Sequence, residues 1–128
     1  MTNTHEGSCL CGAVRYTTDG PLSDVVACHC SQCRKQTGHY FASTNVADDN
    51  LAISGAEHLE WYRATPEARR AFCRTCGSTL FWKHDNDPFT AILAGSLDGK
   101  TGLALKKHIF CADKGDYYDI DDGLPQTP

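Results

Sequence analysis

Cysteine is the residue type whose number and spacing in this chain could do chemistry. The 128 residues include eight cysteines, and seven of them fall into three short groups. The groups are Cys9-Leu10-Cys11, Cys28-His29-Cys30-Ser31-Gln32-Cys33 and Cys73-Arg74-Thr75-Cys76. Structural zinc sites usually have four protein ligands, whereas catalytic zinc sites have three and leave one position open. Two pairs and one triplet therefore predict one closed site and one open site, and the open site on Cys28, Cys30 and Cys33 is where a reaction would take place.

A set of disulfides in a secreted scaffold is the alternative use of so many cysteines. Residues 1–8 lack the basic start and apolar run of a signal peptide. A bridge between Cys9 and Cys11 would close a strained, very small ring, whereas thiolates two residues apart on a strand share one face and can bind one metal ion. A chain of 128 residues can also bury a core without such bridges. We therefore expect reduced, metal-binding cysteines and a cytoplasmic protein.

The composition limits the partners that the chain is expected to have. Twelve Lys and Arg residues against sixteen Asp and Glu residues give a formal net charge of −4, which argues against binding nucleic acid by neutralising phosphates. No run of residues reaches the roughly twenty apolar residues of a membrane-spanning helix. The length fits one domain, so we expect a single zinc-binding domain over residues 1–128 with its core at about 5–125.

Short apolar and β-branched runs between turn signals predict an all-β fold of small antiparallel sheets. The strands are expected at residues 10–18, 24–30, 40–47, 51–54, 58–63, 71–73, 78–83, 89–97 and 105–111. Gly55 separates two of these segments and favours a hairpin between them. Only residues 31–38 and 66–70 are expected to be helical. Metal ions that tie the loops together would stabilise sheets of this size.

The order of the groups suggests that the two cysteine pairs share one metal ion, although spacing alone leaves this open. Such an ion would clamp the N-terminal strand to the second half of the chain and close a loop of about sixty residues. Metal binding of this kind contributes folding free energy, on the order of 10 kcal/mol for structural zinc. Gly12 and Gly77 each follow the second cysteine of a pair, which meets the need for small residues and for backbone N–H groups near sulfur.

The triplet would also be a closed site if Cys111 or a histidine supplied a fourth ligand, and a non-catalytic zinc module that binds a protein partner would use the same cysteines. No second ligand pair accompanies the triplet at suitable spacing, which favours an open position. Three thiolates donate electron density to zinc, so the ion should acidify water less than a three-histidine site does. The donor set therefore favours an incoming sulfur over hydrolysis. We expect Cys111 to be a buried thiol; a reactive Cys111 would instead indicate a thiol-redox enzyme.

Three segments carry a resemblance to a known family, and the tail from His108 to Pro125 is similar too. The segments are Gly7-Ser8-Cys9-Leu10-Cys11-Gly12-Ala13-Val14, Cys28-His29-Cys30-Ser31-Gln32-Cys33-Arg34-Lys35-Gln36-Thr37-Gly38 and Phe72-Cys73-Arg74-Thr75-Cys76-Gly77-Ser78. The chain resembles the glutathione-dependent formaldehyde-activating (GFA) family, which shares its domain with centromere protein V. The resemblance implies a zinc-supported β-tent fold, a structural zinc on Cys9, Cys11, Cys73 and Cys76, and a labile catalytic zinc on Cys28, Cys30 and Cys33.

The resemblance also implies carbon-sulfur lyase chemistry that makes or breaks S-hydroxymethylglutathione from glutathione and formaldehyde. On this basis the substrate thiol would enter the open position of the three-cysteine zinc and lose its proton there. His29 and His39 lie nearest in sequence for proton transfer. In an extended segment His29 points away from the cysteines on either side, so we expect it to pack or to form hydrogen bonds instead.

Charged and aromatic residues beside these motifs bear on the substrate. Arg34, Lys35 and Arg74 lie next to the cysteine groups and either meet the carboxylates of glutathione or remain solvated charges. Family tails often carry Lys, two further residues and then Trp, whereas Lys114 is followed here by the sequence GDYY. If that aromatic position lines the site, the substrate differs from the usual one.

Overall fold

The computed structural model describes residues 4–128, and these residues form mainly short strands. Along the chain the strands are β1 (His5–Ser8), β2 (Arg15–Thr18), β3 (Val25–Cys28), β4 (Phe41–Ala47), β5 (Leu51–Ser54), β6 (Leu59–Tyr62), β7 (Ala68–Cys73), β8 (Thr79–His84), β9 (Phe89–Leu93) and β10 (Leu105–Ile109). The α-helix α1 (Ser31–Thr37) follows β3, and the single 3-10 turns are η1 (Asp48–Asn50), η2 (Ala56–His58), η3 (Ala94–Ser96) and η4 (Cys111–Asp113). The all-β class predicted from the sequence is confirmed. Among residues 4–128, the helices are all too short or too polar to cross a lipid bilayer.

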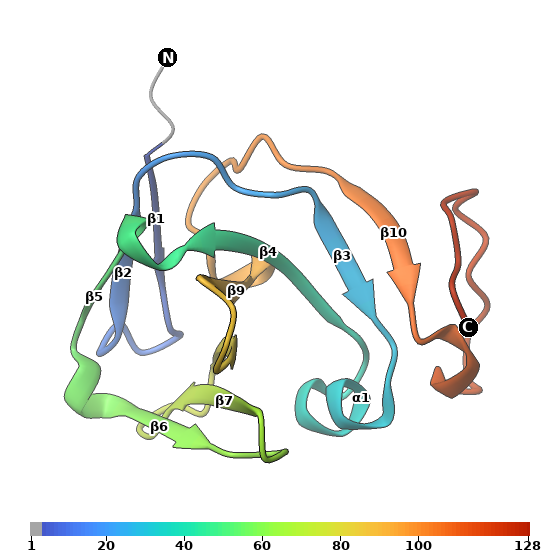
Figure 1. The fold of residues 1–128 in the computed structure, drawn as a ribbon, viewed down its shortest axis with the longest axis horizontal. Helices are drawn as coiled ribbons and strands as arrows, with labels where there is room; N and C mark the ends of the chain where they lie inside the picture. The colour runs from blue at the N-terminus through green and yellow to red at the C-terminus, as the bar shows by residue number, and fades with distance from the viewer. Residues whose placement is uncertain (1–3) are drawn as a thin grey trace.

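The strands of residues 4–128 form two sheets. β1, β2 and β5 make a three-stranded sheet, and the other seven strands make a sheet in the order β10-β3-β4-β9-β8-β7-β6. Neighbouring strands in both sheets pair antiparallel, as predicted from the sequence. The exception is the pair of β10 and β3, which run parallel. Figure 1 shows that the larger sheet curls, with β3, β4 and β10 across from β6 and β7, and that α1 lies at the end of β3. The curl gives this sheet a concave face.

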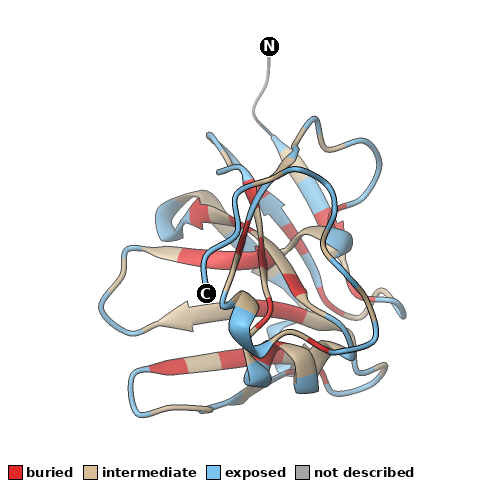
Figure 2. Ribbon diagram, turned by 90° about the vertical axis from the view of Figure 1, so that its right-hand side faces the viewer, coloured by how far each residue is buried: buried red, intermediate tan, exposed pale blue. Residues whose placement is uncertain are grey.

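The hydrophobic core lies between the two sheets. Tyr16 of β2 packs edge-on against Phe81 of β8 with ring centroids 5.2 Å apart, and Trp61 of β6 stacks on the same Phe81 ring at 6.4 Å. Trp61 is partly buried, whereas Val14, Val46, Leu80 and Ile92 of this core are fully buried. Figure 2 shows that buried residues are concentrated in the strands, whereas the C-terminal segment is mostly exposed. Each large apolar side chain buried in this way stabilises the fold by about 1.5–3 kcal/mol, which holds the two sheets together.

The predicted hairpin around Gly55 is wrong. β5 pairs with β2 in the smaller sheet, and β6 pairs with β7 in the larger one. Gly55 has a φ of +77°, and a Cβ atom at this position would lie 1.9 Å from the carbonyl oxygen of Ala13. The chain therefore passes directly against the backbone of another segment here and turns through η2 into the second sheet. Gly55 marks a crossing between sheets.

The predicted helix at residues 66–70 is also wrong, because β7 begins at Ala68 and pairs with strands on both sides. Sheet pairing and burial override the local preference of this segment. The predicted strand at residues 10–18 is shorter, so Cys9 and Cys11 lie in a turn before β2, and β1 was missing from the prediction. The strands predicted at residues 89–97 and 105–111 end earlier, at Leu93 and Ile109.

Candidate metal centres and groove

The first cysteine cluster joins the turn after β1 to the end of β7. The sulfur atoms of Cys9, Cys11, Cys73 and Cys76 all lie within 4.8 Å of one another. The sulfur atoms of Cys9 and Cys11 are 3.6 Å apart, and those of Cys11 and Cys73 are 3.7 Å apart. A tetrahedral zinc ion with Zn–S bonds of about 2.3 Å would separate its sulfurs by about 3.8 Å, whereas a disulfide bond measures about 2.05 Å. All eight cysteines are free, and this spacing fits one metal ion held by four thiolates.

Glycine turns and one serine shape this cluster. Gly12 and Gly77 have φ angles of +80° and +79°, a region that residues with a Cβ rarely adopt. The N–H of Gly77 donates to the carbonyl of Cys73 at 2.8 Å, which closes a tight turn. The side-chain hydroxyl of Ser78, 3.2 Å from the sulfur of Cys76, and the backbone of Ser78 lower the pKa of Cys76 to about 5. These contacts favour the thiolate form of Cys76, which is the form that binds metal.

The second cluster lies where β3 ends and α1 begins. Cys28 is the last residue of β3, Cys30 is the N-cap of α1 and Cys33 lies in its first turn. The Cys30 sulfur accepts a hydrogen bond from the N–H of Cys33 at 3.3 Å, and the three sulfur atoms lie within 4.8 Å of one another. Within residues 4–128, this group has no fourth cysteine, histidine or carboxylate at that distance. The cluster can therefore hold a metal ion with one position left for another molecule.

Cys111, the alternative fourth ligand, lies outside this cluster. The prediction of a buried thiol on an apolar strand is wrong, because β10 ends at Ile109 and Cys111 is half-buried at the start of η4. Phe110, which has a φ of +55°, turns the chain between the end of β10 and the start of η4. The backbone N–H of Cys111 donates to the carbonyl of Thr127 at 2.9 Å, so the C-terminal segment holds this turn in place.

The two histidines considered for proton transfer lie away from the sulfur atoms. His29 is only 1% exposed and its ring contacts Tyr118 and His108 by hydrogen bonds, which confirms the prediction that it packs and forms hydrogen bonds. His39 Nδ1 lies 2.9 Å from the hydroxyl of Tyr117. The tail aromatics Tyr117 and Tyr118 thus contact these histidines, and the lining of the groove beside the triplet includes neither tyrosine.

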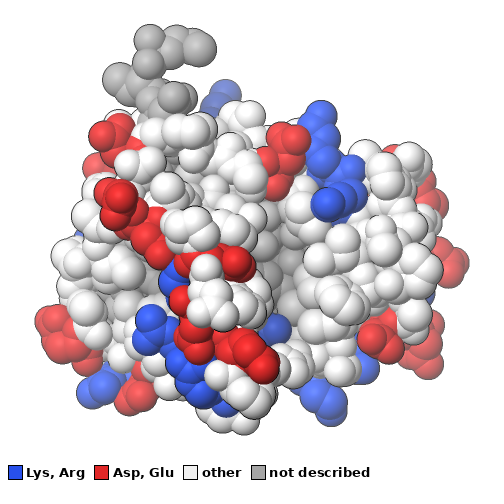
Figure 3. Space-filling view, viewed as in Figure 1, with Lys and Arg blue, Asp and Glu red and all other residues white. Residues whose placement is uncertain are grey.

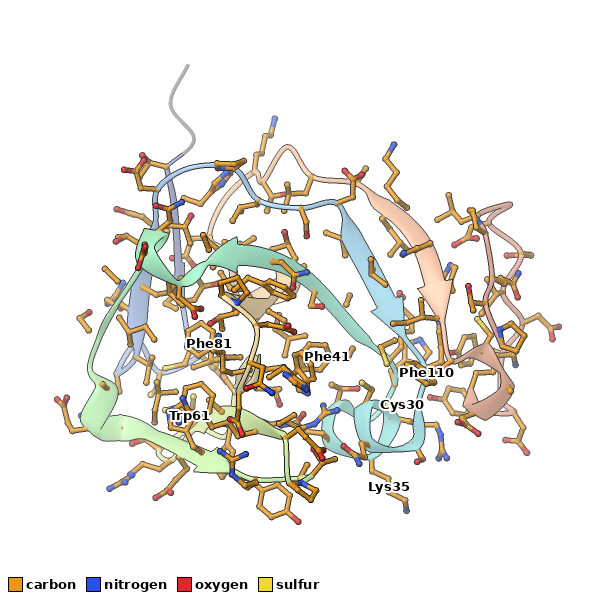
Figure 4. All side chains as sticks on the ribbon, in the orientation of Figure 1. Cys30, Lys35, Phe41, Trp61, Phe81 and Phe110 are labelled. Carbon is orange, nitrogen blue, oxygen red and sulfur yellow. The ribbon has the colours of Figure 1, made fainter. Side chains whose placement is uncertain are left out.

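A groove of about 620 Å³ opens beside the triplet on the concave face of the larger sheet. Successive side chains of a strand alternate between the two faces of a sheet, so Phe41 of β4 lines the groove while Val46 of the same strand lies in the core. Aromatic residues of the lining are Phe41, Trp82, Phe89 and Phe110. Figure 4 shows Cys30, Phe41 and Phe110 on the side of α1, with Phe81 and Trp61 on the core side. An incoming molecule can therefore reach the three sulfurs along aromatic walls.

Arg70 of β7 is a buried cation beside the triplet. It is 5% exposed; its Nη2 donates to the sulfur of Cys33 at 3.5 Å, and its Nη1 donates to Oε1 of Gln36 at 2.7 Å. Hydrogen bonds with Cys28 and with Arg70 lower the pKa of Cys33 to about 6. The same contact with Cys33 raises the pKa of Cys28. Cys33 is therefore ionised more readily than Cys28.

The sequence analysis considered three other cationic side chains as partners for the carboxylates of glutathione. Arg34 Nε donates to the carbonyl of Asp113 at 3.1 Å, Arg74 forms an ion pair with Glu60 at 2.9 Å, and Lys35 projects away from the triplet in Figure 4. The lining of the groove includes none of these three cations. Figure 3 shows acidic and basic side chains side by side on the face seen in Figure 1. The sequence could identify Arg70 as a residue of the site only if residues 68–73 were recognised as a strand whose side chains alternate between the two faces of the sheet.

The fold and the two clusters define a small β protein with two candidate metal–thiolate centres, one closed by four sulfurs and one beside a groove. The family model described as glutathione-dependent formaldehyde-activating enzyme matches residues 4–113. The chain belongs to this GFA family of enzymes, which confirms the resemblance seen in the sequence.

Individual relatives agree with this assignment. A Halomonas elongata protein named "Putative glutathione-dependent formaldehyde-activating enzyme" is 32% identical over 129 residues, which cover 91% of this chain and 80% of the relative. A Schizosaccharomyces pombe protein named as an uncharacterized lyase is 28% identical over 118 residues, with coverage of 91% and 85%. The crystal structure of a Rhodobacter sphaeroides protein superimposes with a TM-score of 0.65 at 26% identity and covers 95% of this chain and 99% of that one. The similarity therefore extends over almost the whole chain.

Proposed function

We propose that the protein is a zinc-dependent carbon-sulfur lyase that forms or cleaves an S-hydroxymethyl thiol adduct such as S-hydroxymethylglutathione. The observation that carries this proposal is the inequality of the two clusters: four sulfurs in one, and three beside a groove in the other. The family description and the name of the Halomonas elongata relative support glutathione and formaldehyde as the substrate pair.

In this proposal the two clusters have different tasks within one domain of residues 1–128. The four-cysteine cluster of Cys9, Cys11, Cys73 and Cys76 holds a structural zinc, and Cys28, Cys30 and Cys33 hold a catalytic zinc. Thiolate donors at these sulfur separations suit zinc. When bound to three thiolates, zinc supplies a Lewis-acid position that stabilises an incoming thiol as its thiolate. Because the ligands must stay reduced, the activity is proposed for the cytoplasm.

The residues around the triplet orient the reactants and limit the charge of the site. Phe41 and Phe110 flank the cluster and direct a thiol along the groove while excluding water. Three thiolates around a divalent ion leave net negative charge, and a fourth thiolate increases it. Arg70, which donates to the Cys33 sulfur, offsets part of this charge, and the low polarity of its buried position strengthens the effect.

The proposed reaction balances without a further reactant. In the direction of synthesis the thiol sulfur forms a bond to the aldehyde carbon, and the proton lost by the thiol ends on the aldehyde oxygen. In the reverse direction the carbon-sulfur bond breaks and the proton returns to sulfur. The chain's contribution is to hold the thiol and the aldehyde next to each other, which removes much of the entropic cost of their encounter.

Cobalt substitution tests the proposal. The full-length protein loaded with Co²⁺ should change its visible spectrum when glutathione is added, because a sulfur joins the three-cysteine centre. The Cys30→Ser variant should keep the spectrum of the four-cysteine centre, lose the response to glutathione and lose lyase activity with glutathione and formaldehyde. A wild-type protein that binds cobalt but neither responds to glutathione nor turns over would instead be a non-catalytic metal module.

A further inference from the structure

Four side chains form a continuous hydrogen-bonded chain behind the triplet. The hydroxyl of Tyr118 lies 2.5 Å from Nδ1 of His29, and Nε2 of His29 lies 2.9 Å from Nδ1 of His108. The chain continues from Nε2 of His108 to a carboxylate oxygen of Asp122 at 2.7 Å. Both imidazoles are buried, with 1% of His29 and 4% of His108 exposed. The C-terminal segment, defined as residues 111–128, thus reaches the peptide between two of the candidate metal ligands.

With both imidazoles neutral, the hydrogen bonds run in one direction along the whole chain. A hydrogen bond from His108 holds the pKa of Asp122 below its usual range, so this carboxylate is ionised and can only accept. His108 must then donate through Nε2, and when its ring carries a single proton its Nδ1 accepts from Nε2–H of His29. The Nδ1 of His29 accepts in turn from the hydroxyl of Tyr118. Every buried ring nitrogen therefore has a partner, and removing either end leaves one of them unsatisfied.

The ring of His29 determines the orientation of its two neighbours. Side chains on either side of an extended residue point to the opposite face, and Cys28 and Cys30 line the groove while His29 is buried behind them. The backbone N–H of His29 also donates to the carbonyl of Ile109 at 2.9 Å. Because both the ring and the backbone of His29 are held, the directions of the two adjacent cysteine side chains are restricted.

The far end of the hydrogen-bonded chain is anchored along β10. The N–H of His108 donates to the carbonyl of Pro125, and the N–H of Thr127 donates to the carbonyl of His108, both at 2.9 Å. At the other end of the hydrogen-bonded chain, the ammonium group of Lys114 donates to the backbone carbonyl of Tyr118. Figure 1 shows the end of this segment beside β10. Tyr118 and Asp122 both lie beyond residue 113, where the match to the family model ends.

We infer that the C-terminal segment is a positioning element for the three-cysteine cluster. Through Tyr118 and Asp122 it holds His29, and His29 keeps the sulfurs of its two neighbours at the separation that one metal ion needs. This inference rests on metal binding at the triplet, which is one part of the proposed function, and not on the lyase reaction. Residues that orient metal ligands from behind typically change metal affinity by about 10-fold to 100-fold.

The test compares cobalt affinities of full-length variants by competition with a chelator, followed through thiolate-to-cobalt absorption. Tyr118→Phe and Asp122→Ala should weaken binding at the triplet by about 10-fold to 100-fold and leave the four-cysteine centre unchanged. Asp122→Asn should restore part of the affinity, because its amide oxygen can still accept from His108. The matched control is Tyr16→Phe, which removes a tyrosine hydroxyl 2.6 Å from the Ser96 hydroxyl in the core and should leave the triplet unchanged.

Amide hydrogen exchange of residues 28–33 adds a readout that needs neither metal nor activity. Exchange should be faster in Tyr118→Phe and Asp122→Ala than in Tyr16→Phe. If wild-type protein loads the triplet and both tail variants load it with the same affinity, the inference is overturned while the proposed function stands. If wild-type protein takes up no metal at the triplet, both the inference and the proposed function fail.

Discussion

The guanidinium of Arg70 lies 3.5 Å from the sulfur of Cys33 and joins β7 of the larger sheet to the three-cysteine cluster. A second hydrogen bond, to Gln36, fixes the guanidinium, while its Nε has no hydrogen-bond partner among residues 4–128. A buried charge is stable only when it is paired, and the ionised sulfur of Cys33 is an anion within its reach. Arg70 therefore stabilises the ionised form of Cys33.

Replacing Arg70 with Met should shift metal binding by the triplet to higher pH. Cys28 and Arg70 together lower the pKa of Cys33 to about 6, so losing Arg70 raises that pKa and keeps the thiol protonated to a higher pH. Because metal ions bind thiolates, the midpoint of cobalt uptake should rise. Arg70→Lys should raise the midpoint less, because lysine keeps the positive charge but lacks the planar set of N–H donors of the guanidinium. Cobalt absorption measured against pH gives the midpoint.

Arg63→Met is the matched control for this titration. Arg63 forms a 2.8 Å ion pair with Asp85, both side chains are exposed, and the lining of the groove does not include Arg63. Its loss should leave the midpoint of cobalt uptake where it is in the wild type. An Arg70→Met protein with the wild-type midpoint would show that the contact with Cys33 has no electrostatic consequence.

The two cysteine clusters could be predicted from the sequence because Cys28, Cys30 and Cys33 and the two cysteine pairs have the short-range spacing that is typical of metal ligands. The all-β class could be predicted for the same reason, since strand alternation and turn residues are local. The contact of His29 with His108 joins residues 79 positions apart, and it depends on β10 lying beside β3. No local pattern carries that information, so the hydrogen-bonded chain appears only in the structure.

Arg70 was missed for a related reason. Residues 66–70 contain no pattern that distinguishes a helical turn from a strand. The strand forms because β7 pairs with β6 on one side and with β8 on the other. Gly55 was misinterpreted because a glycine that permits a hairpin and a glycine that permits close approach to Ala13 look the same in a sequence. Where local sequence signals are ambiguous, tertiary contacts therefore determine the local structure.

Serine substitutions should separate the roles of the two clusters. Cys73 is fully buried and belongs to the cluster that ties the turn after β1 to β7, so Cys73→Ser should remove most of the folding free energy that metal supplies, on the order of 10 kcal/mol in small zinc domains. Cys30→Ser removes one of three ligands at the edge of the groove and should leave a folded protein without turnover. Circular dichroism and metal content after dialysis distinguish the two, and equal unfolding of both variants would contradict separate roles.

A pair of substitutions at Phe110 should separate backbone strain from contact with substrate. Phe110 is 51% exposed, lines the groove and has a φ of +55°. Glycine adopts this conformation without strain, so Phe110→Gly should be more stable than Phe110→Ala by about 1 kcal/mol in urea unfolding. Both variants lose the same ring and should bind glutathione about tenfold more weakly in the cobalt protein. An alanine variant as stable as the glycine variant would contradict strain at this position.

The ion pair of Lys83 with Asp48 should make part of the stability depend on acid pH. The Lys83 ammonium lies 2.6 Å from Asp48 and 3.0 Å from the Phe89 carbonyl, and the hydroxyl of Thr90 donates to Asp48 at 2.7 Å. Burial alone would raise the pKa of Asp48, but the bonds from Lys83 and Thr90 outweigh it and hold this pKa below the ordinary value of 3.8. A carboxylate of this kind contributes stability above its unfolded pKa and loses that contribution as the pH falls through its folded pKa.

Asp48→Asn should therefore be less stable than wild type at pH 7, by about 1 kcal/mol because the pair is partly exposed. The difference should shrink as the pH falls below about 4 and disappear once Asp48 is protonated in the folded wild type as well. Urea unfolding at a series of pH values measures both effects. Asp49→Asn changes the charge by the same amount one residue away and serves as the control. A difference between wild type and Asp48→Asn that stays constant down to pH 2 would mean that hydrogen bonding rather than charge supplies the stability, because only the charged form responds to the proton.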